Sequence, residues 1–151
     1  MTEDIRQFVE FKLGEETYGV DILQVKTIER MMPITRVPKA PQFVEGVINL
    51  RGDIVPVIDL KKRFDLPKRE ETDNTRIIIV NVEDITVGMI VDSATEVIQL
   101  PQNAIEMAPS IVAGIDADFL QGVGKIGDKL LIILDLLKIL KPDEIEQLAE
   151  M

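Results

Sequence analysis

Few of the side chains in this 151-residue chain could take part in chemistry. The sequence contains no His and no Cys, so it lacks the commonest general base, the thiol nucleophile and the usual zinc ligands. The carboxylates of Asp59 and Asp135 could form an acid–base dyad. The planar guanidinium of Arg51 could pair with a carboxylate or amide of a partner. This inventory favours binding over catalysis.

Asp59 and Asp135 have two interpretations. Each is followed by a short Leu-rich segment, 60–64 and 136–140, so each could cap a helix by accepting a backbone N–H group. A concave pocket that holds both carboxylates within roughly 10 Å would instead support a catalytic dyad. No phosphate-binding loop, nucleophile elbow or calcium-loop spacing accompanies them in the sequence.

Arg51 is the one basic residue set between two strongly apolar segments, and the following Gly52 suits a tight hairpin turn. Its guanidinium either recognises a partner or ties the turn to a neighbouring carboxylate or carbonyl of the same chain. The residues alone leave these two alternatives open.

The charge and the apolar content narrow the class of protein. The 17 Lys and Arg residues against 27 Asp and Glu residues give a net charge of -10, which argues against binding to a phosphate backbone. The N-terminus has no basic and apolar signal segment, and no apolar run approaches the roughly 18 residues of a membrane span. We therefore expect a cytoplasmic protein that has no cofactor and does not insert into a membrane.

The chain repeats itself across a polar linker at 67–74. The segment 17–20 reads Thr-Tyr-Gly-Val, and 69 residues later the segment 86–89 reads Thr-Val-Gly-Met. At an offset of 76 residues, 43–47 (Phe-Val-Glu-Gly-Val) matches 119–123 (Phe-Leu-Gln-Gly-Val). These matches fall on glycines, turns and aliphatic positions, which a repeated backbone plan would preserve.

The hydrophobic pattern predicts a mainly β fold. Short turns at 14–16 and 83–84 would each join two strands into a hairpin. One short helical turn is expected within 21–28, and a final helix over 142–151, where Pro142 suits the first helical position. The expected strands are 8–13, 17–20, 47–50, 54–58, 76–82, 85–91, 122–126 and 130–134.

Each half has the size of one small closed barrel of about five strands. A barrel this small buries little core alone, so two would share an apolar seam. We therefore expect one sub-barrel over about 5–66, a second over about 75–140, and a C-terminal helix that closes one end. The assignment of individual strands to one barrel or the other stays open at this point.

The block 43–60, Phe-Val-Glu-Gly-Val-Ile-Asn-Leu-Arg-Gly-Asp-Ile-Val-Pro-Val-Ile-Asp-Leu, resembles the signature of the bacterial chemotaxis coupling protein family, CheW. The segments 18–25, 87–92 and 132–135 are similar to further blocks of that family. The resemblance implies two intertwined five-stranded Src-homology-3-like β-barrels. It also implies a non-catalytic adaptor that couples transmembrane chemoreceptors to the histidine kinase CheA, in the cytoplasm at membrane-associated receptor arrays. A two-barrel adaptor for another kinase signalling system is the alternative.

Some apolar residues are expected on partner-facing edge strands, which offer both backbone groups and apolar stripes. The resemblance implies that the cytoplasmic tip of a chemoreceptor docks in a groove between the barrels, near Val25, Ile28, Gly46, Arg51 and Val97. It implies that the regulatory domain of CheA contacts Ile54, Thr75, Arg76 and Ile77. A second kinase contact is expected around Glu106 and Ile111.

Overall fold

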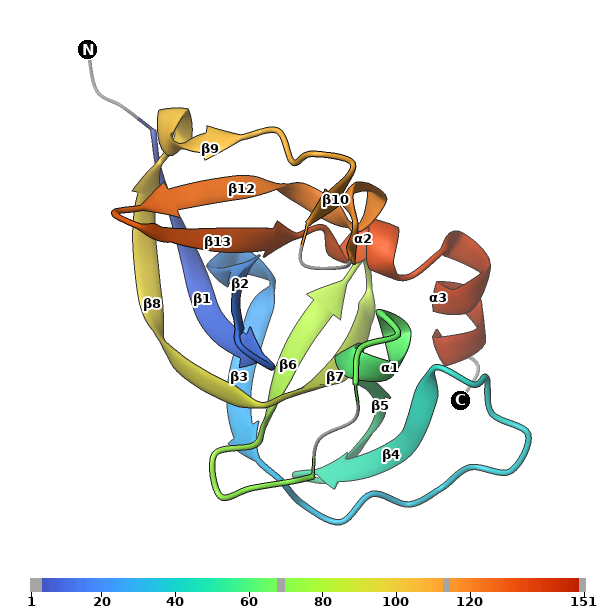
Figure 1. Ribbon diagram of the computed structural model, residues 1–151. Coiled ribbons are helices and arrows are strands. Elements are labelled where there is room, and N and C mark those ends of the chain that lie inside the picture. The colour runs from blue at the N-terminus through green and yellow to red at the C-terminus, as the bar shows by residue number, and fades with distance from the viewer. Residues whose placement is uncertain (1–3, 68–69, 113–114, 150–151) are drawn as a thin grey trace.

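The computed structural model describes residues 4–67, 70–112 and 115–149 and is drawn in Figure 1. The first half of the chain runs β1 (Ile5–Leu13), β2 (Glu16–Asp21), a 3-10 turn η1 (Ile22–Gln24), β3 (Val25–Arg30), β4 (Val44–Leu50), β5 (Asp53–Asp59) and α1 (Leu60–Arg63). The second half runs β6 (Arg76–Val82), β7 (Ile85–Val91), β8 (Ser93–Pro101), η2 (Gln102–Ala104), β9 (Ile105–Glu106), β10 (Ile111–Val112), β11 (Ile115–Asp116), η3 (Ala117–Phe119), β12 (Leu120–Ile126), β13 (Lys129–Leu134), α2 (Leu136–Ile139) and α3 (Pro142–Ala149). The mainly β fold with few short helices is confirmed.

Every strand expected from the sequence is present, and β6 and β7 have the expected bounds. The helical turn expected within 21–28 is limited to η1, after which the chain continues as β3. Asp21 caps η1 by accepting the Leu23 N–H at 2.9 Å. Within the residues that the structure describes, no helix is both long and apolar enough to cross a membrane.

Hydrogen bonding orders the strands into two main sheets. Sheet A runs β8-β1-β2-β13-β12-β9 and sheet B runs β3-β6-β7-β5-β4, while β10 and β11 pair with each other. The two orders are equivalent under the sequence repeat, because β3 corresponds to β8, the β1–β2 hairpin to β6–β7, β4 to β12 and β5 to β13. The hairpin of each half therefore lies between strands of the other half, which is how the two units intertwine. Closure of either sheet into a barrel stays a prediction.

The largest apolar cluster lies between the two sheets. It joins Phe11 and Tyr18 of sheet A to Ile78 and Met89 of sheet B, and it also takes in Leu148 of α3. Burial raises the pKa of Tyr18 to about 12, and the nearby Glu16 carboxylate adds to that rise. This cluster is the shared seam expected from the small size of each unit, and it sets how the sheets lie relative to each other.

Each sheet also has a smaller apolar cluster on its other face. In both clusters the central residues are fully buried, including Ile77 in sheet B and its repeat equivalent Phe8 in sheet A. The sheet B cluster contains Ile48, Val55, Val57, Ile77 and Ile79. The sheet A cluster contains Phe8, Leu100, Leu131 and Ile133.

A glycine follows a bulge at equivalent places in the two sheets. The register of β4 shifts between Val44 and Gly46, and that of β12 between Leu120 and Gly122. A Cβ atom on Gly46 would clash with the backbone carbonyl oxygen of Thr35, and one on Gly122 would lie 2.6 Å from the carbonyl oxygen of Glu106. In both places another chain segment approaches the strand too closely for a side chain.

Candidate functional site

Arg51 stands at the tip of the β4–β5 hairpin. Both residues of its two-residue turn have positive φ, 51° for Arg51 and 93° for Gly52, as a type I′ turn requires. The Asn49 side chain supports the turn by accepting the Gly52 N–H at 2.9 Å. Asn49, Arg51 and Gly52 therefore act together to hold the guanidinium at a rigid, projecting corner.

The Arg51 guanidinium forms an ion pair within the chain and also stays largely exposed. It lies 2.8 Å from a carboxylate oxygen of Glu29, which ties the turn to β3. The Arg51 side chain is nevertheless 69% exposed, whereas that of Glu29 is only 14% exposed. A guanidinium has five N–H donors, so one contact with Glu29 leaves donors for a partner.

Arg51 and Ile54 line one groove of about 390 Å³ on sheet B. Ile54 is 62% exposed although it is aliphatic, and the buried Ile79 also contributes to the wall. Lys26 and Thr27 of β3 close the other side. The structure therefore brings together Arg51, expected to contact a receptor, and Ile54, expected to contact a kinase.

Ile28 and Val97 occupy equivalent positions on the two outer strands β3 and β8, which each pair on one side only. Both side chains are about half exposed. Ile28 lies opposite Ile78, and Val97 lies opposite Val9. Ile78 and Val9 both belong to the seam cluster, so Ile28 and Val97 extend the seam toward solvent at its two free edges.

Two other residues expected near the receptor are less accessible. Val25 is partly buried and packs against the seam cluster. Gly46 is buried, and it lies where Thr35 and Val47 exchange backbone hydrogen bonds of 2.9 and 2.8 Å. Gly46 therefore permits the close approach of the 31–43 segment to β4 and presents no surface of its own.

Thr75 directly precedes β6, which begins with Arg76 and Ile77, but only Arg76 reaches the surface. Its guanidinium donates to the carbonyl oxygens of Asp73 and Thr75 at 2.8 and 2.9 Å. Thr75 is buried and its hydroxyl oxygen accepts the Thr72 N–H, and Ile77 is fully buried. The side chains of Thr75 and Ile77 are therefore closed to direct contact with a partner in this structure.

The strand register separates Ile54 from Arg76. Residue Val57 of β5 pairs with Gly88 of β7, which in turn pairs with Ile79 of β6. Since β5 and β6 run in opposite directions, Ile54 and Arg76 lie at opposite ends of sheet B, about 20 Å apart at about 3.3 Å per residue. The four residues expected at one kinase contact are thus not gathered in one patch.

Glu106 and Ile111 lie on short second-half strands, and the pairing of Glu106 with Val123 corresponds to the single bridge between Thr35 and Val47 in the first half. Glu106 is exposed on β9, at the edge of sheet A, where it forms an ion pair of 3.2 Å with Lys125. Ile111 begins β10 and pairs with Asp116. Both therefore belong to a part of the molecule distinct from the Arg51 groove on sheet B.

Asp59 and Asp135 are helix caps. The Asp59 carboxylate accepts the Lys61 N–H at 2.9 Å, and the Asp135 carboxylate accepts the Leu137 N–H at 3.1 Å. These bonds satisfy donors that the first turns of α1 and α2 leave without intrahelical partners. The capping interpretation is therefore the one that the structure bears out.

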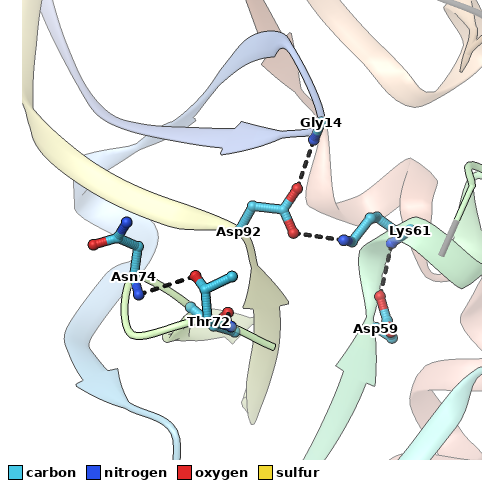
Figure 2. A network of polar contacts seen from close by, with 7 residues as sticks. Gly14, Asp59, Lys61, Thr72, Asn74 and Asp92 are labelled. Atoms are coloured by element: carbon cyan, nitrogen blue, oxygen red, sulfur yellow. Dashed lines mark hydrogen bonds and ion pairs between the residues drawn. The ribbon is translucent and has the colours of Figure 1, made fainter. Parts of the chain in front are cut away.

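A polar network that the sequence did not reveal joins the two sheets (Figure 2). Lys61 of α1 is only 8% exposed, and its ammonium lies 2.6 Å from one carboxylate oxygen of Asp92. The other Asp92 oxygen accepts the Gly14 N–H at 2.6 Å from the β1–β2 turn. Lys61 thus links the end of sheet B to the hairpin of sheet A. A lysine inside the Leu-rich segment after Asp59 was the one available signal.

Comparison with known proteins adds a family and a fold. The family model described as CheW-like domain matches residues 7–144. The chain is 42% identical over 138 residues to the chemotaxis protein CheW of Bacillus subtilis (strain 168), covering 89% of this chain and 88% of that protein. It is 40% identical over 151 residues to the chemotaxis protein CheW of Treponema pallidum (strain Nichols), covering 96% and 88%.

A solved structure has the same fold. The crystal structure of the scaffolding protein TtCheW from Thermoanaerobacter tengcongensis superposes with a TM-score of 0.85 at 42% sequence identity. The match covers 95% of this chain and 92% of that one. The intertwined sheets described above are therefore shared with a protein whose name states a scaffolding role.

Proposed function

The chain belongs to the family defined by the CheW-like domain, and from that membership we propose that it is a non-catalytic adaptor that couples transmembrane chemoreceptors to the histidine kinase CheA. Its relatives are named as chemotaxis proteins, and one is named a scaffolding protein. The observation that carries the proposal is the exposure of aliphatic residues on free strand edges and at a hairpin groove, because such residues are anchors for a protein partner.

The receptor surface in this proposal follows the free edges of the seam. Ile28 and Val97 supply exposed aliphatic anchors on β3 and β8. Arg51 supplies donors for a carboxylate or amide of the receptor's cytoplasmic tip, and Glu29 holds its guanidinium in place. Val25 and Gly46 contribute through packing beneath that surface.

The kinase surface in this proposal is centred on Ile54, which the regulatory domain of CheA would cover. Arg76 would add a charged contact at the other end of sheet B, while the buried Thr75 and Ile77 shape the strand that carries it. Glu106 on sheet A and Ile111 on β10 would provide a second kinase contact. Because Arg51 and Ile54 share one groove, the receptor and kinase footprints would meet there.

The adaptor works by proximity and needs no cofactor. Two proteins bound to separate surfaces of one rigid body have a raised effective concentration for each other. The protein would be cytoplasmic and would be recruited to receptor arrays at the membrane by its partners. A change of receptor state would reach the kinase as a coupling free energy between the two surfaces.

Reconstitution with the organism's own CheA and with vesicles bearing its chemoreceptors tests the proposal. We expect the kinase to sediment with the receptor vesicles only when this chain is added. We expect Ile54→Lys to weaken kinase binding at least tenfold by calorimetry, because a charge replaces an apolar anchor.

Leu137→Lys is the matched control, since Leu137 is also half exposed but lies on α2, away from the groove. It should leave kinase affinity within twofold. Equal loss in both variants, or sedimentation of the kinase without this chain, would contradict the proposal. Binding to a different histidine kinase but not to CheA would favour the adaptor of another signalling system.

A further inference from the structure

A cleft between the 36–45 segment, α1 and α3 carries a local positive charge on a chain whose net charge is -10. It consists of two cavities of about 250 and 660 Å³ that share Gln42 and Lys62. Arg36 and Lys39 line the smaller cavity, and Arg63 lines the larger one. This cleft lies apart from the surfaces proposed above for receptor and kinase, and the inference does not rest on that function.

Both carboxylates that line the cleft already pair with basic side chains of the same chain. Glu45 forms an ion pair with Lys62, and Glu144 of α3 accepts two hydrogen bonds from the Arg63 guanidinium at 2.9 and 2.7 Å. Arg36 and Lys39 are exposed, and no side-chain hydrogen bond or ion pair involves them within the described residues. Two uncompensated cations therefore remain in the lining after its acids are paired.

The segment that carries these cations is held in place. Thr35, directly before Arg36, exchanges two backbone hydrogen bonds with Val47 of β4. A turn follows in which the Ala40 N–H donates to the Val37 carbonyl oxygen at 3.2 Å, and Lys39 adopts a left-handed φ of 63°. The two cations are thus presented by an ordered backbone, which lowers the conformational entropy lost when a ligand binds.

The shape and chemistry of the cleft fit a peptide better than a small anion. The two cavities reach from the 36–42 segment to Glu144 of α3, and Val37, Pro41 and Phe43 add apolar wall beside the charges. We propose that this cleft binds an acidic segment of a partner protein, with carboxylates at Arg36 and Lys39 and an apolar side chain against Val37 and Pro41. The acidic remainder of the surface would repel such a segment everywhere else, so its charge also selects this cleft.

A titration of the ¹⁵N-labelled full chain with the acetylated and amidated peptide Glu-Glu-Leu-Glu-Glu tests the proposal by NMR at low salt. We expect the largest shifts at the amides of residues 36–42 and a dissociation constant that rises with ionic strength. Arg36→Glu with Lys39→Glu should raise that constant at least tenfold, and the double Gln variant about threefold. Circular dichroism should show both variants folded, because both side chains are exposed.

The matched control is Lys129→Glu with Lys138→Glu, which makes the same change in net charge at two exposed lysines elsewhere. It should alter the dissociation constant less than twofold. An equal loss in the control would mean that binding follows net charge alone and would overturn the proposal. Inorganic phosphate binding residues 36–42 as tightly as the peptide would overturn it in favour of a small-anion site. Dimerisation in sedimentation velocity that the Arg36→Glu, Lys39→Glu variant abolishes would overturn it in favour of a second copy of this chain.

Discussion

Sheets A and B share the same order over five strands but have different side chains at equivalent positions. The β4–β5 turn presents Arg51, whereas the equivalent β12–β13 turn has Gly127 and Asp128. Lys61 is buried in an ion pair on α1, whereas its equivalent Leu137 is half exposed on α2. The two regions therefore share a backbone plan and differ in the side chains at equivalent positions.

Several positions that the two sheets have in common control the backbone. Gly46 and Gly122 each admit a neighbouring segment at a bulge. Asp59 and Asp135 each cap the short helix that follows the last strand of their half, β5 or β13. A residue retained in both halves is thus evidence for folding, and a residue that differs is the better candidate for function.

The largest expected effect tests whether each sheet depends on its own small cluster. Phe8 and Ile77 are equivalent and fully buried. We expect Phe8→Ala to lower the free energy of unfolding by about 4 kcal/mol and Ile77→Ala by about 3 kcal/mol, in proportion to the volume removed. Urea denaturation measures both. A loss below about 1 kcal/mol in one variant would show that its cluster is dispensable.

The two bulge glycines sharpen the comparison of backbone positions. Gly46→Ala should cost about 3 kcal/mol and Gly122→Ala about 2 kcal/mol, because each Cβ meets a backbone carbonyl oxygen. Gly127→Ala is the control, since its Cβ meets nothing within 4 Å and only its φ of 58° is unfavourable. It should cost about 1 kcal/mol. Thermal unfolding of the three variants gives the order, and equal costs would contradict it.

The Lys61 network is present in one half only. Lys61→Met should cost about 2 kcal/mol, because it leaves the partly buried Asp92 carboxylate without its cation while the Gly14 N–H still donates to it. Leu137→Met, at the equivalent exposed position, should change stability by less than about 0.5 kcal/mol. A double-mutant cycle tests the link by adding Asp92→Asn to Lys61→Met. If the second substitution restores none of the stability that the first one lost, the ion pair does not link the sheets.

Tyr18 and its equivalent Val87 are both fully buried in the seam, but only Tyr18 has a hydroxyl, which has no hydrogen-bond partner among the described residues. Tyr18→Phe should therefore raise stability by about 1 kcal/mol. The pKa of Tyr18 in the folded protein is about 12, above the ordinary value of 10.0. The stabilisation that comes from this difference in pKa is therefore fully present below pH 10 and is lost as the pH rises from about 10 to 12. Unfolding curves across that range should show a steeper decline for the parent protein than for the variant.

Replacing Arg51 should cause the smallest change in stability and a large change in receptor binding. Its ion pair with Glu29 is exposed on the Arg51 side, so Arg51→Ala should cost less than about 0.5 kcal/mol. Receptor binding in the vesicle assay should fall at least tenfold if the guanidinium is a contact. An unfolded variant by circular dichroism would show instead that the tie to Glu29 is its main role. Glu29→Gln distinguishes the ion-pair role of Arg51 from its receptor-contact role, because this variant removes the ion pair and keeps the guanidinium.

Much of the fold follows from short stretches of sequence. The sequence correctly predicted the bounds of β6 and β7, the caps at Asp59 and Asp135 and the turn at Gly52. Each of these features depends on residues within three or four positions of one another. The sequence did not predict the strands β3 and β8 or the short β9, β10 and β11, because they carry weaker apolar alternation. Long-range pairing supplied β3, β8 and β9 with partners that local preference does not indicate, whereas β10 and β11 pair with each other.

The candidate site was less predictable than the fold. The sequence and its family resemblance selected Ile28, Ile54, Arg51 and Val97, and all four are exposed. Ile77 was selected by the same reasoning but is fully buried. Exposure is set by the segments that pack over a residue, and those segments are remote in the chain.

By itself, the sequence determined most of the longer strands, the turns, the helix caps, the internal repeat and the family. Only the tertiary structure decided that each hairpin lies between strands of the other half, that Arg51 meets Glu29, and that Lys61 joins α1 to the β1–β2 turn. The physical reason is one of range. Torsional preference, capping and turn chemistry act over a few residues, whereas strand exchange, burial and ion pairing depend on which distant surfaces remove the most apolar area from water.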